Sequence, residues 1–297
     1  MQRRSFIRNT SLTVGAISLS SKNIFGALFQ QPPFKIKMLR GDIGIFSERG
    51  GTIGFYQSRD GFVVVDSQFP DQSKHLIDEL KKNSELPFKL LINTHHHGDH
   101  TGGNISFKGI VEHVVGHENC LINYKRVTEA KTADKQLYQD ITFGKSWKQK
   151  AGKEKIKAHY FGAAHTNGDA IIHFEHANVA HMGDLLFNQM HPFIDRSSGA
   201  SIKSWITVLQ KTRSQFDNDT IYIFGHAADP EKITGNKQDI IAFEDYLQKL
   251  LAFVEREIKA GKSKEEIIKN KEIPGLSWKA TGAERSLLAA YEELSTT

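Results

Sequence analysis

The sequence predicts an α/β sandwich in which helices cover the outside of the sheets. Short apolar runs with the length of strands alternate with longer segments of helical periodicity. This sheet-and-helix pattern occurs once in the first half of the chain and again in the second half. Three further helical stretches follow the second half, and they predict a helical layer at the C-terminus.

The first half carries strands, one helix and a final strand. Strands are predicted over 34–46, 52–57 and 61–67, with a hairpin turn at Arg59-Asp60-Gly61. A proline start followed by apolar spacing predicts a helix over 70–83. Residues 88–94 (FKLLINT) form a short and nearly all-apolar strand. A run of histidines begins where this strand ends.

The second half repeats this organisation. The predicted elements are strands over 155–161, 170–175, 179–184 and 220–227, a helix over 201–216, and C-terminal helices over 238–261, 263–271 and 282–294. The segment 133–153 lies between the halves. It has two readings: a flap lined by Tyr138, Phe143 and Trp147, or plain packing of these aromatic side chains, which is their commoner role.

The amino-acid composition limits the classes of function that the chain can have. An apolar content of 39% and a charged content of 25% are ordinary for a globular protein. The single cysteine, Cys120, excludes an internal disulfide and a cysteine-rich zinc module, and is expected to be a buried thiol. The net charge of +5 falls to about +1 without the basic residues of positions 1–27, which are Arg3, Arg4, Arg8 and Lys22. Nucleic-acid binding is therefore not expected.

The N-terminus is predicted to be an export signal covering residues 1–27. A basic start is followed by a weakly apolar run from Leu12 to Leu19, which is too short to be a stable membrane anchor. The start RRSFIR resembles a twin-arginine signal, which implies the twin-arginine (Tat) export machinery as a partner and a periplasmic or exported protein. The alternative is a disordered basic tail.

The stretch NTHHHGDHTGGN, residues 93–104, predicts a metal site. Side chains alternate in an extended segment, so His95 and His97 face the same way and His96 points elsewhere. Asp99 and His100 follow in the turn. Neutral imidazoles and carboxylates are good zinc ligands.

Further ligands of the same kind follow later strands. His165, Asp184 and His226 each come after an apolar run, and we expect all of them at one end of the sheet, close to the histidine run. Other residues of the loop 187–201 are candidates for substrate contact: His191, Asp195 and Arg196. The alternative is that Asp195 and Arg196 only order this loop.

The motif H-x-H-x-D-H, present as His95, His97, Asp99 and His100, resembles the signature of the metallo-β-lactamase fold superfamily. The resemblance extends over nearly all of the chain after the signal, with Asp66, His165, Asp184 and His226 at further landmarks. It implies a four-layer αββα sandwich over 34–235, followed by a C-terminal helical extension over 236–297. It also implies a binuclear metal site at the edge between the sheets.

The resemblance assigns roles to these residues. His95, His97 and His165 would bind the first metal, Asp99, His100 and His226 the second, and Asp184 would bridge the two. Asp66 would hold the ligand loop by hydrogen bonds. The expected ions are two Zn²⁺, with iron or manganese as alternatives in either site.

The implied activity is hydrolysis of a small-molecule substrate by a hydroxide shared between the two metals. Asp99 would act as the catalytic residue by orienting this nucleophile and passing on its proton. The bond would be that of an ester, lactone, thioester, amide or phosphoester. Zinc β-lactamases as a group carry a cysteine or no ligand at the landmark of Asp184, so β-lactam hydrolysis is less expected.

Three alternatives remain beside this hydrolase. One is β-lactamase activity, another is a dioxygenase with a single iron, and the third is a non-catalytic metal-binding protein of an exported redox system. The sequence also leaves open whether the C-terminal helices cover the sandwich or form a contact between two copies of the chain.

Overall fold

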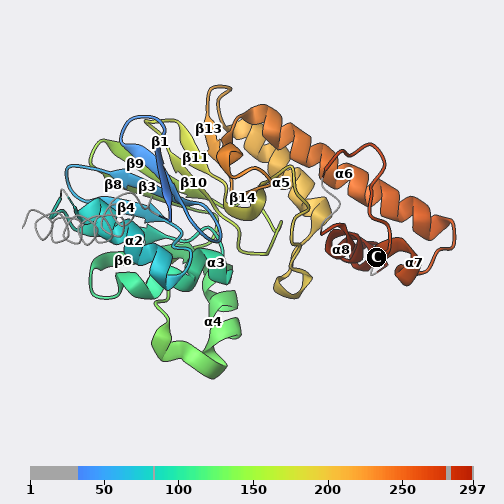
Figure 1. The fold of residues 1–297 in the computed structure, drawn as a ribbon, viewed down its shortest axis with the longest axis horizontal. Helices are drawn as coiled ribbons and strands as arrows, with labels where there is room; N and C mark the ends of the chain where they lie inside the picture. Colours follow the sequence, from blue (N-terminus) through green and yellow to red (C-terminus); the bar gives the residue numbers. More distant parts are fainter. Residues whose placement is uncertain (1–32, 83, 279–281, 296–297) are drawn as a thin grey trace, which may run out of the picture. The chain divides into compact units, whose positions relative to one another are not determined.

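A computed structural model describes residues 33–82, 84–278 and 282–295. The chain divides into two units, 1–35 and 36–297, and the second unit contains the fold (Figure 1). The export signal predicted for residues 1–27 lies outside the described residues. In the described part of the chain, no helix is long and apolar enough to cross a membrane.

The first sheet has seven strands in the order β1-β2-β3-β4-β5-β6-β7. Its strands are β1 (Lys35–Met38), β2 (Ile43–Ser47), β3 (Ile53–Gln57), β4 (Phe62–Val65), β5 (Phe88–Ile92), β6 (Val111–His117) and β7 (Ile141–Phe143). The pairs from β2 to β4 are antiparallel, whereas β4, β5, β6 and β7 run parallel to one another. The carboxyl ends of the parallel strands therefore meet at one edge of the sheet.

The second sheet has six strands in the order β15-β13-β11-β10-β9-β8. Its strands are β8 (Ser146–Ala151), β9 (Glu154–His159), β10 (Ile171–Phe174), β11 (Val179–His181), β13 (Ile221–Ile223) and β15 (Thr234–Gly235). Strands β11 and β13 are parallel, so they also end at a common edge. Two short parallel strands, β12 (Phe187–Asn188) and β14 (His226–Ala227), form a separate small sheet beside it.

A buried apolar core lies between the two sheets. Val63, Leu90 and Ile92 of the first sheet belong to the same cluster as Ile172 and Ile223 of the second, and all are fully buried. Alternate side chains of each strand point the other way and meet helices. This alternation is why strands such as FVVV are apolar on both faces.

Helices cover both outer faces and complete an αββα sandwich, which confirms the predicted fold class (Figure 1). On the first sheet, α2 (Pro70–Lys81) and the 3-10 helix η1 (Gly102–Phe107) lie outside Phe88, whose ring centroid is 5.3 Å from that of Phe107. On the second, α5 (Ile202–Gln215) buries Trp205 in one cluster with Tyr222 of β13.

The C-terminal part consists of α6 (Lys237–Lys259), α7 (Lys264–Ile268) and α8 (Ala283–Ser295). Helix α6 buries Ile240, Phe243 and Leu250 in the same cluster as Trp205 of α5. The Tyr246 ring is stacked on Trp278, with a centroid distance of 4.3 Å. These helices therefore extend the outer layer of the second sheet.

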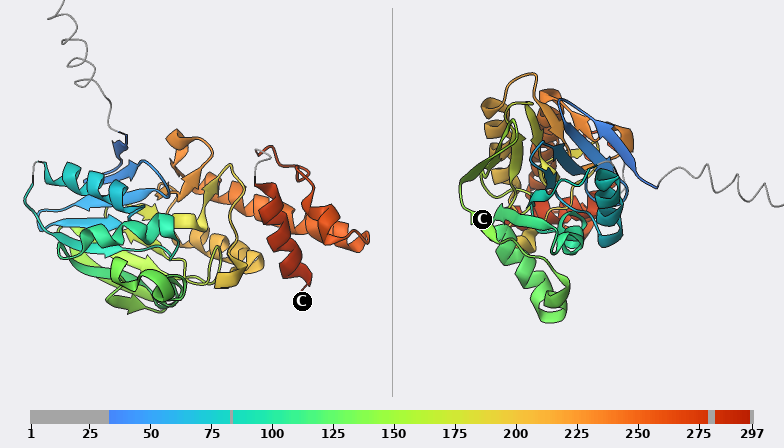
Figure 2. Two further views of the ribbon diagram at one scale, coloured as in Figure 1. Left: turned by 60° about the horizontal axis from the view of Figure 1, so that its bottom comes forward. Right: turned by 90° about the vertical axis from the view of Figure 1, so that its left-hand side faces the viewer.

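Two regions differ from the expected elements. The segment 133–153 is not a flap, because it supplies β7 and β8 to the edges of the two sheets and buries Phe143 between them. Strand β6 and helix α4 (Glu118–Thr132) had no predicted counterpart. Figure 2 shows α4 reaching away from the sheets, and two of its apolar residues, Ile122 and Val127, are 61% and 55% exposed.

Candidate metal centre

The predicted ligands all follow strand ends at one edge of the sandwich. His95 lies three residues beyond the end of β5, His97 caps the short helix α3 (Gly98–Thr101), and α3 carries Asp99 and His100. The second sheet contributes His165 after β9, Asp184 after β11 and His226 after β13. The structure thus brings together every residue of the predicted ligand set, in groups whose ligand atoms lie within 4.8 Å of one another.

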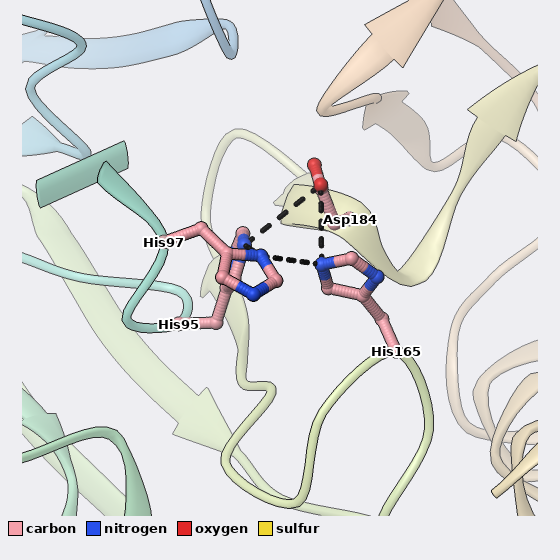
Figure 3. A group of neighbouring side chains, drawn as sticks. All are labelled: His95, His97, His165 and Asp184. Atoms are coloured by element: carbon pink, nitrogen blue, oxygen red, sulfur yellow. Dashed lines mark hydrogen bonds and ion pairs between the residues drawn. The ribbon is translucent and has the colours of Figure 1, made fainter. Parts of the chain in front are cut away.

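Three imidazoles and one carboxylate form the first group (Figure 3). His97 Nδ1 lies 3.1 Å from His95 Nε2 and 2.9 Å from His165 Nε2. Asp184 Oδ2 lies 3.3 Å from His165 Nε2 and 3.8 Å from His95 Nε2. Nitrogens bound to one tetrahedral zinc ion are about 3.3 Å apart, so this spacing fits such an ion.

The second group combines Asp99, His100 and His226. His226 Nε2 lies 3.1 Å from Asp99 Oδ2 and 3.4 Å from His100 Nε2. Asp184 Oδ1 lies 3.0 Å from His100 Nε2 and 3.3 Å from His226 Nε2. One oxygen of Asp184 therefore faces each group.

Asp184 is a buried carboxylate whose environment favours charge. Burial alone would raise the pKa of Asp184, but His226, His100 and His165 together hold it well below its usual range. Its Oδ1 atom accepts no hydrogen bond of good geometry from the described residues. A buried, ionised oxygen without a hydrogen bond of good geometry is suited to bind a cation. The donor set therefore fits metal ions in both groups.

The pKa values of His95 and His165 in the first group shift in the opposite direction from those of His100 and His226 in the second. Burial lowers the pKa of His165 to about 3 and that of His95 well below its usual value, so both are neutral, the form that binds metals. Burial also opposes charge on His100 and His226, but facing carboxylates raise the pKa of His100 and bring that of His226 to about 9. The pKa of Asp99 falls to about 2 beside His100 and His226, in spite of burial.

Asp66 holds the ligand loop in place. Its Oδ2 atom lies 2.7 Å from His100 Nδ1 and accepts a hydrogen bond of 2.7 Å from Thr94 Oγ1. Its Oδ1 atom accepts a hydrogen bond of 2.8 Å from the Thr94 backbone N–H. Asp66 itself has a φ of 63°, a left-handed conformation that costs a non-glycine residue free energy. The fold accepts this cost at the residue that orients His100.

The loop after Asp184 orients the first group. His97 Nε2 lies 3.0 Å from Asp195 Oδ2, and His165 Nδ1 lies 2.7 Å from the carbonyl oxygen of Phe193. Asp195 is fixed in turn by a hydrogen bond of 2.6 Å from Ser197 Oγ. His96 points away from the first group, with Nε2 3.2 Å from Ser198 Oγ, as alternation along the segment predicts.

Two glycines permit the close approach of chain segments at the site. A Cβ at Gly225 would lie 2.0 Å from Asp184 Oδ1, and one at Gly51 would lie 2.2 Å from the His100 ring. Neither position has space for a side chain. Both backbone positions beside the second group can therefore only be glycine.

A pocket of about 750 Å³ opens onto both groups. The residues that line it are His97, Asp99, Asp184, Phe187, Met190, His191, Pro192, Phe193, His226, Gly282, Glu284 and Arg285. The loop predicted to lie over the site therefore does so from Phe187 to Phe193, including His191.

Two of the candidate substrate contacts have other roles. Asp195 binds His97, and Arg196 pairs with Glu293 of α8 at 3.1 Å, so both order the loop. The sequence prediction missed Glu284 and Arg285. No spacing in the sequence relates these residues of α8 to the ligands, because only packing of the C-terminal helix brings them to the pocket.

Two adjoining groups of imidazoles and carboxylates, joined by one shared carboxylate at the edge of an αββα sandwich, define a metal-dependent hydrolase. The chain belongs to the metallo-beta-lactamase superfamily, whose family model matches residues 47–226.

Sequence relatives are metallo-β-lactamases. The chain is 24% identical to metallo-beta-lactamase IND-1 of Chryseobacterium indologenes over 203 residues, which is 66% of this chain and 81% of the relative. It is 22% identical to the type 2 enzyme of Elizabethkingia meningoseptica over 221 residues, covering 71% of this chain and 85% of the relative.

Solved structures share the fold. A metallo-beta-lactamase from Pontibacter korlensis has a TM-score of 0.60 at 18% identity and covers 72% of this chain and 99% of its own. A double mutant of the sec-alkyl sulfatase PisA1 has a TM-score of 0.68 at 13% identity, covering 87% of this chain and 50% of its own. The part of the chain before α6 is shorter than the 87% that this neighbour covers. The likeness therefore extends into the C-terminal helices.

Proposed function

We propose that the protein is a hydrolase with two zinc ions, one in each ligand group. The observation that carries this proposal is the position of Asp184, whose two oxygens each face a different group at 3.0 to 3.8 Å. A carboxylate between two ions satisfies both of its oxygens. A single ion would leave one oxygen of this buried carboxylate without a cation ligand.

One ion would be held by His95, His97 and His165. The other would be held by Asp99, His100 and His226, and Asp184 would bind both ions. Two such ions lower the pKa of bound water and polarise the substrate carbonyl. Asp99 is ionised at neutral pH and lines the pocket, so it can accept a hydrogen bond from the attacking water and take up its proton. Asp66 and Asp195 keep the imidazoles in fixed orientations.

The proposed substrates are small molecules with an ester, lactone, thioester, amide or phosphoester bond. A bridging aspartate in place of the cysteine found in many zinc β-lactamases favours these bonds. β-Lactam hydrolysis is the second candidate, because the two sequence relatives reported above are β-lactamases. A sulfate ester also belongs in the substrate panel, since the neighbour whose likeness extends into the C-terminal helices is a sec-alkyl sulfatase.

The test is metal content of the mature protein by elemental mass spectrometry, after purification without added metal. About two zinc ions per chain are expected. The variant Asp184→Ala should lose much of this zinc, whereas Asp219→Ala, at an exposed position just before β13, should keep it. One iron and no zinc per chain would overturn the proposal in favour of oxygen chemistry. Two zinc ions without turnover on any substrate of the panel would favour a non-catalytic metal-binding protein.

We also propose that the protein is exported in folded form. Its support is the RRSFIR start and the apolar run from Leu12 to Leu19. Residues 1–27 fused to a reporter that requires folded export should carry it to the periplasm. Replacing Arg3 and Arg4 by lysine should retain the reporter in the cytoplasm, and export of the substituted fusion would contradict a twin-arginine route.

A further inference from the structure

We propose that Arg285 of α8 binds a carboxylate of the substrate, at the opposite end of the pocket from the bond that is hydrolysed. This inference rests on the proposed function, because it identifies the substrate class of the same pocket. Its starting point is the lining of that pocket. Asp99 and His226 of the ligand groups line it together with Glu284 and Arg285 of the C-terminal helix α8.

Helix α8 is held firmly against the site loop. The buried Glu293 accepts hydrogen bonds from the backbone N–H groups of Ile202 and Lys203 at 2.7 and 3.0 Å and pairs with Arg196 at 3.1 Å. Ser286 Oγ donates to the Pro192 carbonyl at 2.9 Å. Pro192 lines the pocket, and the adjoining Phe193 holds His165 through its carbonyl. The position of Arg285 relative to the ligand groups is therefore fixed by the fold.

Arg285 has a charge that the described protein does not neutralise. It is exposed to the pocket, and no ion pair joins it to a carboxylate of residues 33–82, 84–278 or 282–295. Other arginines near this layer are paired, such as Arg196 with Glu293 and Arg213 with Glu244. A planar guanidinium suits a carboxylate, which it can bind through two parallel hydrogen bonds.

Part of the pocket lining is apolar. Phe187, Met190, Pro192 and Phe193 line the same pocket as the ligand groups and α8. A volume of about 750 Å³ is large enough for a drug-sized molecule. The substrate that fits this arrangement has a hydrolysable acyl group, an apolar body and a carboxylate at its far end.

The first test compares two esters of the same length with the zinc-loaded full chain. One is the mono-4-nitrophenyl ester of adipic acid, which keeps a free carboxylate, and the other is 4-nitrophenyl hexanoate. In both, water adds to the ester carbonyl, the bond to the phenolic oxygen breaks, and a carboxylic acid and 4-nitrophenol are released. We expect a higher kcat/KM for the adipate ester, and this preference should fall roughly tenfold in Arg285→Gln. Arg285→Lys should retain part of it.

The matched control is Arg59→Gln. Arg59 is also exposed and lines a pocket, but that pocket is formed by Ser58 of the β3–β4 turn and Lys153 of the β8–β9 turn. This variant should leave the preference for the adipate ester unchanged. An equal preference in the protein and in Arg285→Gln would overturn the proposal.

The second test does not need turnover. Isothermal titration calorimetry of the metal-depleted chain compares 4-phenylbutyrate with the neutral 4-phenylbutanamide. We expect the acid to bind more tightly than the amide. The ratio of the two affinities should fall about tenfold in Arg285→Gln and should be unchanged in Arg59→Gln. Equal affinity of the acid for the protein and for Arg285→Gln would overturn the role of Arg285. If neither ester is hydrolysed, simple esters are removed from the proposed substrate classes, while calorimetry still decides the role of Arg285.

Discussion

Most imidazoles of the two ligand groups use one nitrogen toward the centre of the group and the other toward the protein. In the first group, the outer nitrogen of His95 contacts Thr94, that of His97 contacts Asp195, and that of His165 contacts the Phe193 carbonyl. In the second group, the outer nitrogen of His100 contacts Asp66. Each partner fixes the tautomer and the orientation of its ring. The two carboxylates among them act on different groups, Asp66 on the second and Asp195 on the first. Their effects can therefore be separated.

Asp66→Asn should weaken the binding of one zinc ion more than the other. It removes the charge beside His100, so the affinity of the second group should fall roughly 10- to 100-fold while the first group is less affected. Stepwise zinc titration against a chromophoric chelator resolves the two affinities. Asp195→Asn is the matched variant and should weaken the first group instead. Equal weakening of both ions by Asp66→Asn would contradict separate supports.

Asp99→Ala should abolish most of the hydrolysis without unfolding the chain. Loss of a positioned proton acceptor lowers kcat by about a hundredfold or more. Steady-state kinetics on the best substrate of the panel give kcat, and circular dichroism checks the fold. Asp219→Ala serves as a control because its carboxylate is exposed and pairs with Arg40. Full activity of Asp99→Ala would show that this residue has no part in the chemistry.

At the scale of elements, a single carboxylate joins two helices. Glu293 of α8 accepts the N-terminal backbone hydrogens of α5 and thereby caps it from outside the helix. Glu293→Ala should lower the free energy of unfolding by about 2–3 kcal/mol, since it leaves buried donors and Arg196 without an acceptor. Urea unfolding gives this value. The same change at the neighbouring exposed Glu292 should have a much smaller effect.

The outer face of the second sheet should be sensitive to acid. Burial and the neighbouring His173 lower the pKa of His159 on β9 to about 4, and its Nε2 has no partner among the described residues. Between pH 6.5 and pH 4, His159 binds a proton in the unfolded chain but stays neutral in the folded chain. The free energy of unfolding is therefore greatest above pH 6.5 and falls as the pH is lowered toward 4.

His159→Gln tests this sensitivity. The variant lacks the titrating group, so its urea midpoint should fall less between pH 7 and pH 4.5 than that of the parent chain. His113→Gln, at a half-exposed position on β6, controls for loss of any histidine. A pH dependence that is the same in His159→Gln and in the parent would assign acid sensitivity to other groups.

The sequence predicts elements well where burial imposes a period. Residues 53–57 and 62–65 are strands and 70–81 is a helix, because each presents apolar residues to a neighbouring layer. Helix α4 is not predicted, because its apolar residues Ile122 and Val127 are exposed and do not mark a buried face of the helix. All seven predicted ligands meet because strand ends set their positions locally. Arg285 could not be predicted, because its place depends on the packing of α8 against a distant loop.

At the scale of the molecule, the ligands come from both halves of the chain. His95, His97, Asp99 and His100 follow the first sheet, whereas His165, Asp184 and His226 follow the second. Bound ions would therefore tie the sheets together. Removal of metal by a chelator should lower the melting temperature, because an ion that binds only the folded state stabilises it by about 2.7 kcal/mol at a concentration a hundred times its Kd.

Differential scanning calorimetry with and without chelator measures this shift. Restoring zinc should restore the melting temperature. The chelator should lower the melting temperature of Asp184→Ala less than that of the parent chain, because the Asp184 carboxylate faces both ligand groups. An unchanged melting temperature on chelation would show that the ions contribute nothing to holding the sheets together.

The division of the ligands between the sheets also orders the events of folding. Neither half of the chain can assemble a complete ligand group alone, because His165 completes the first group and His226 the second. A newly made chain therefore acquires high-affinity metal binding only after its second sheet has formed and docked. Zinc uptake followed in real time during refolding would report the last step of assembly, and a chain stopped before position 165, which completes neither ligand group, would finish without it.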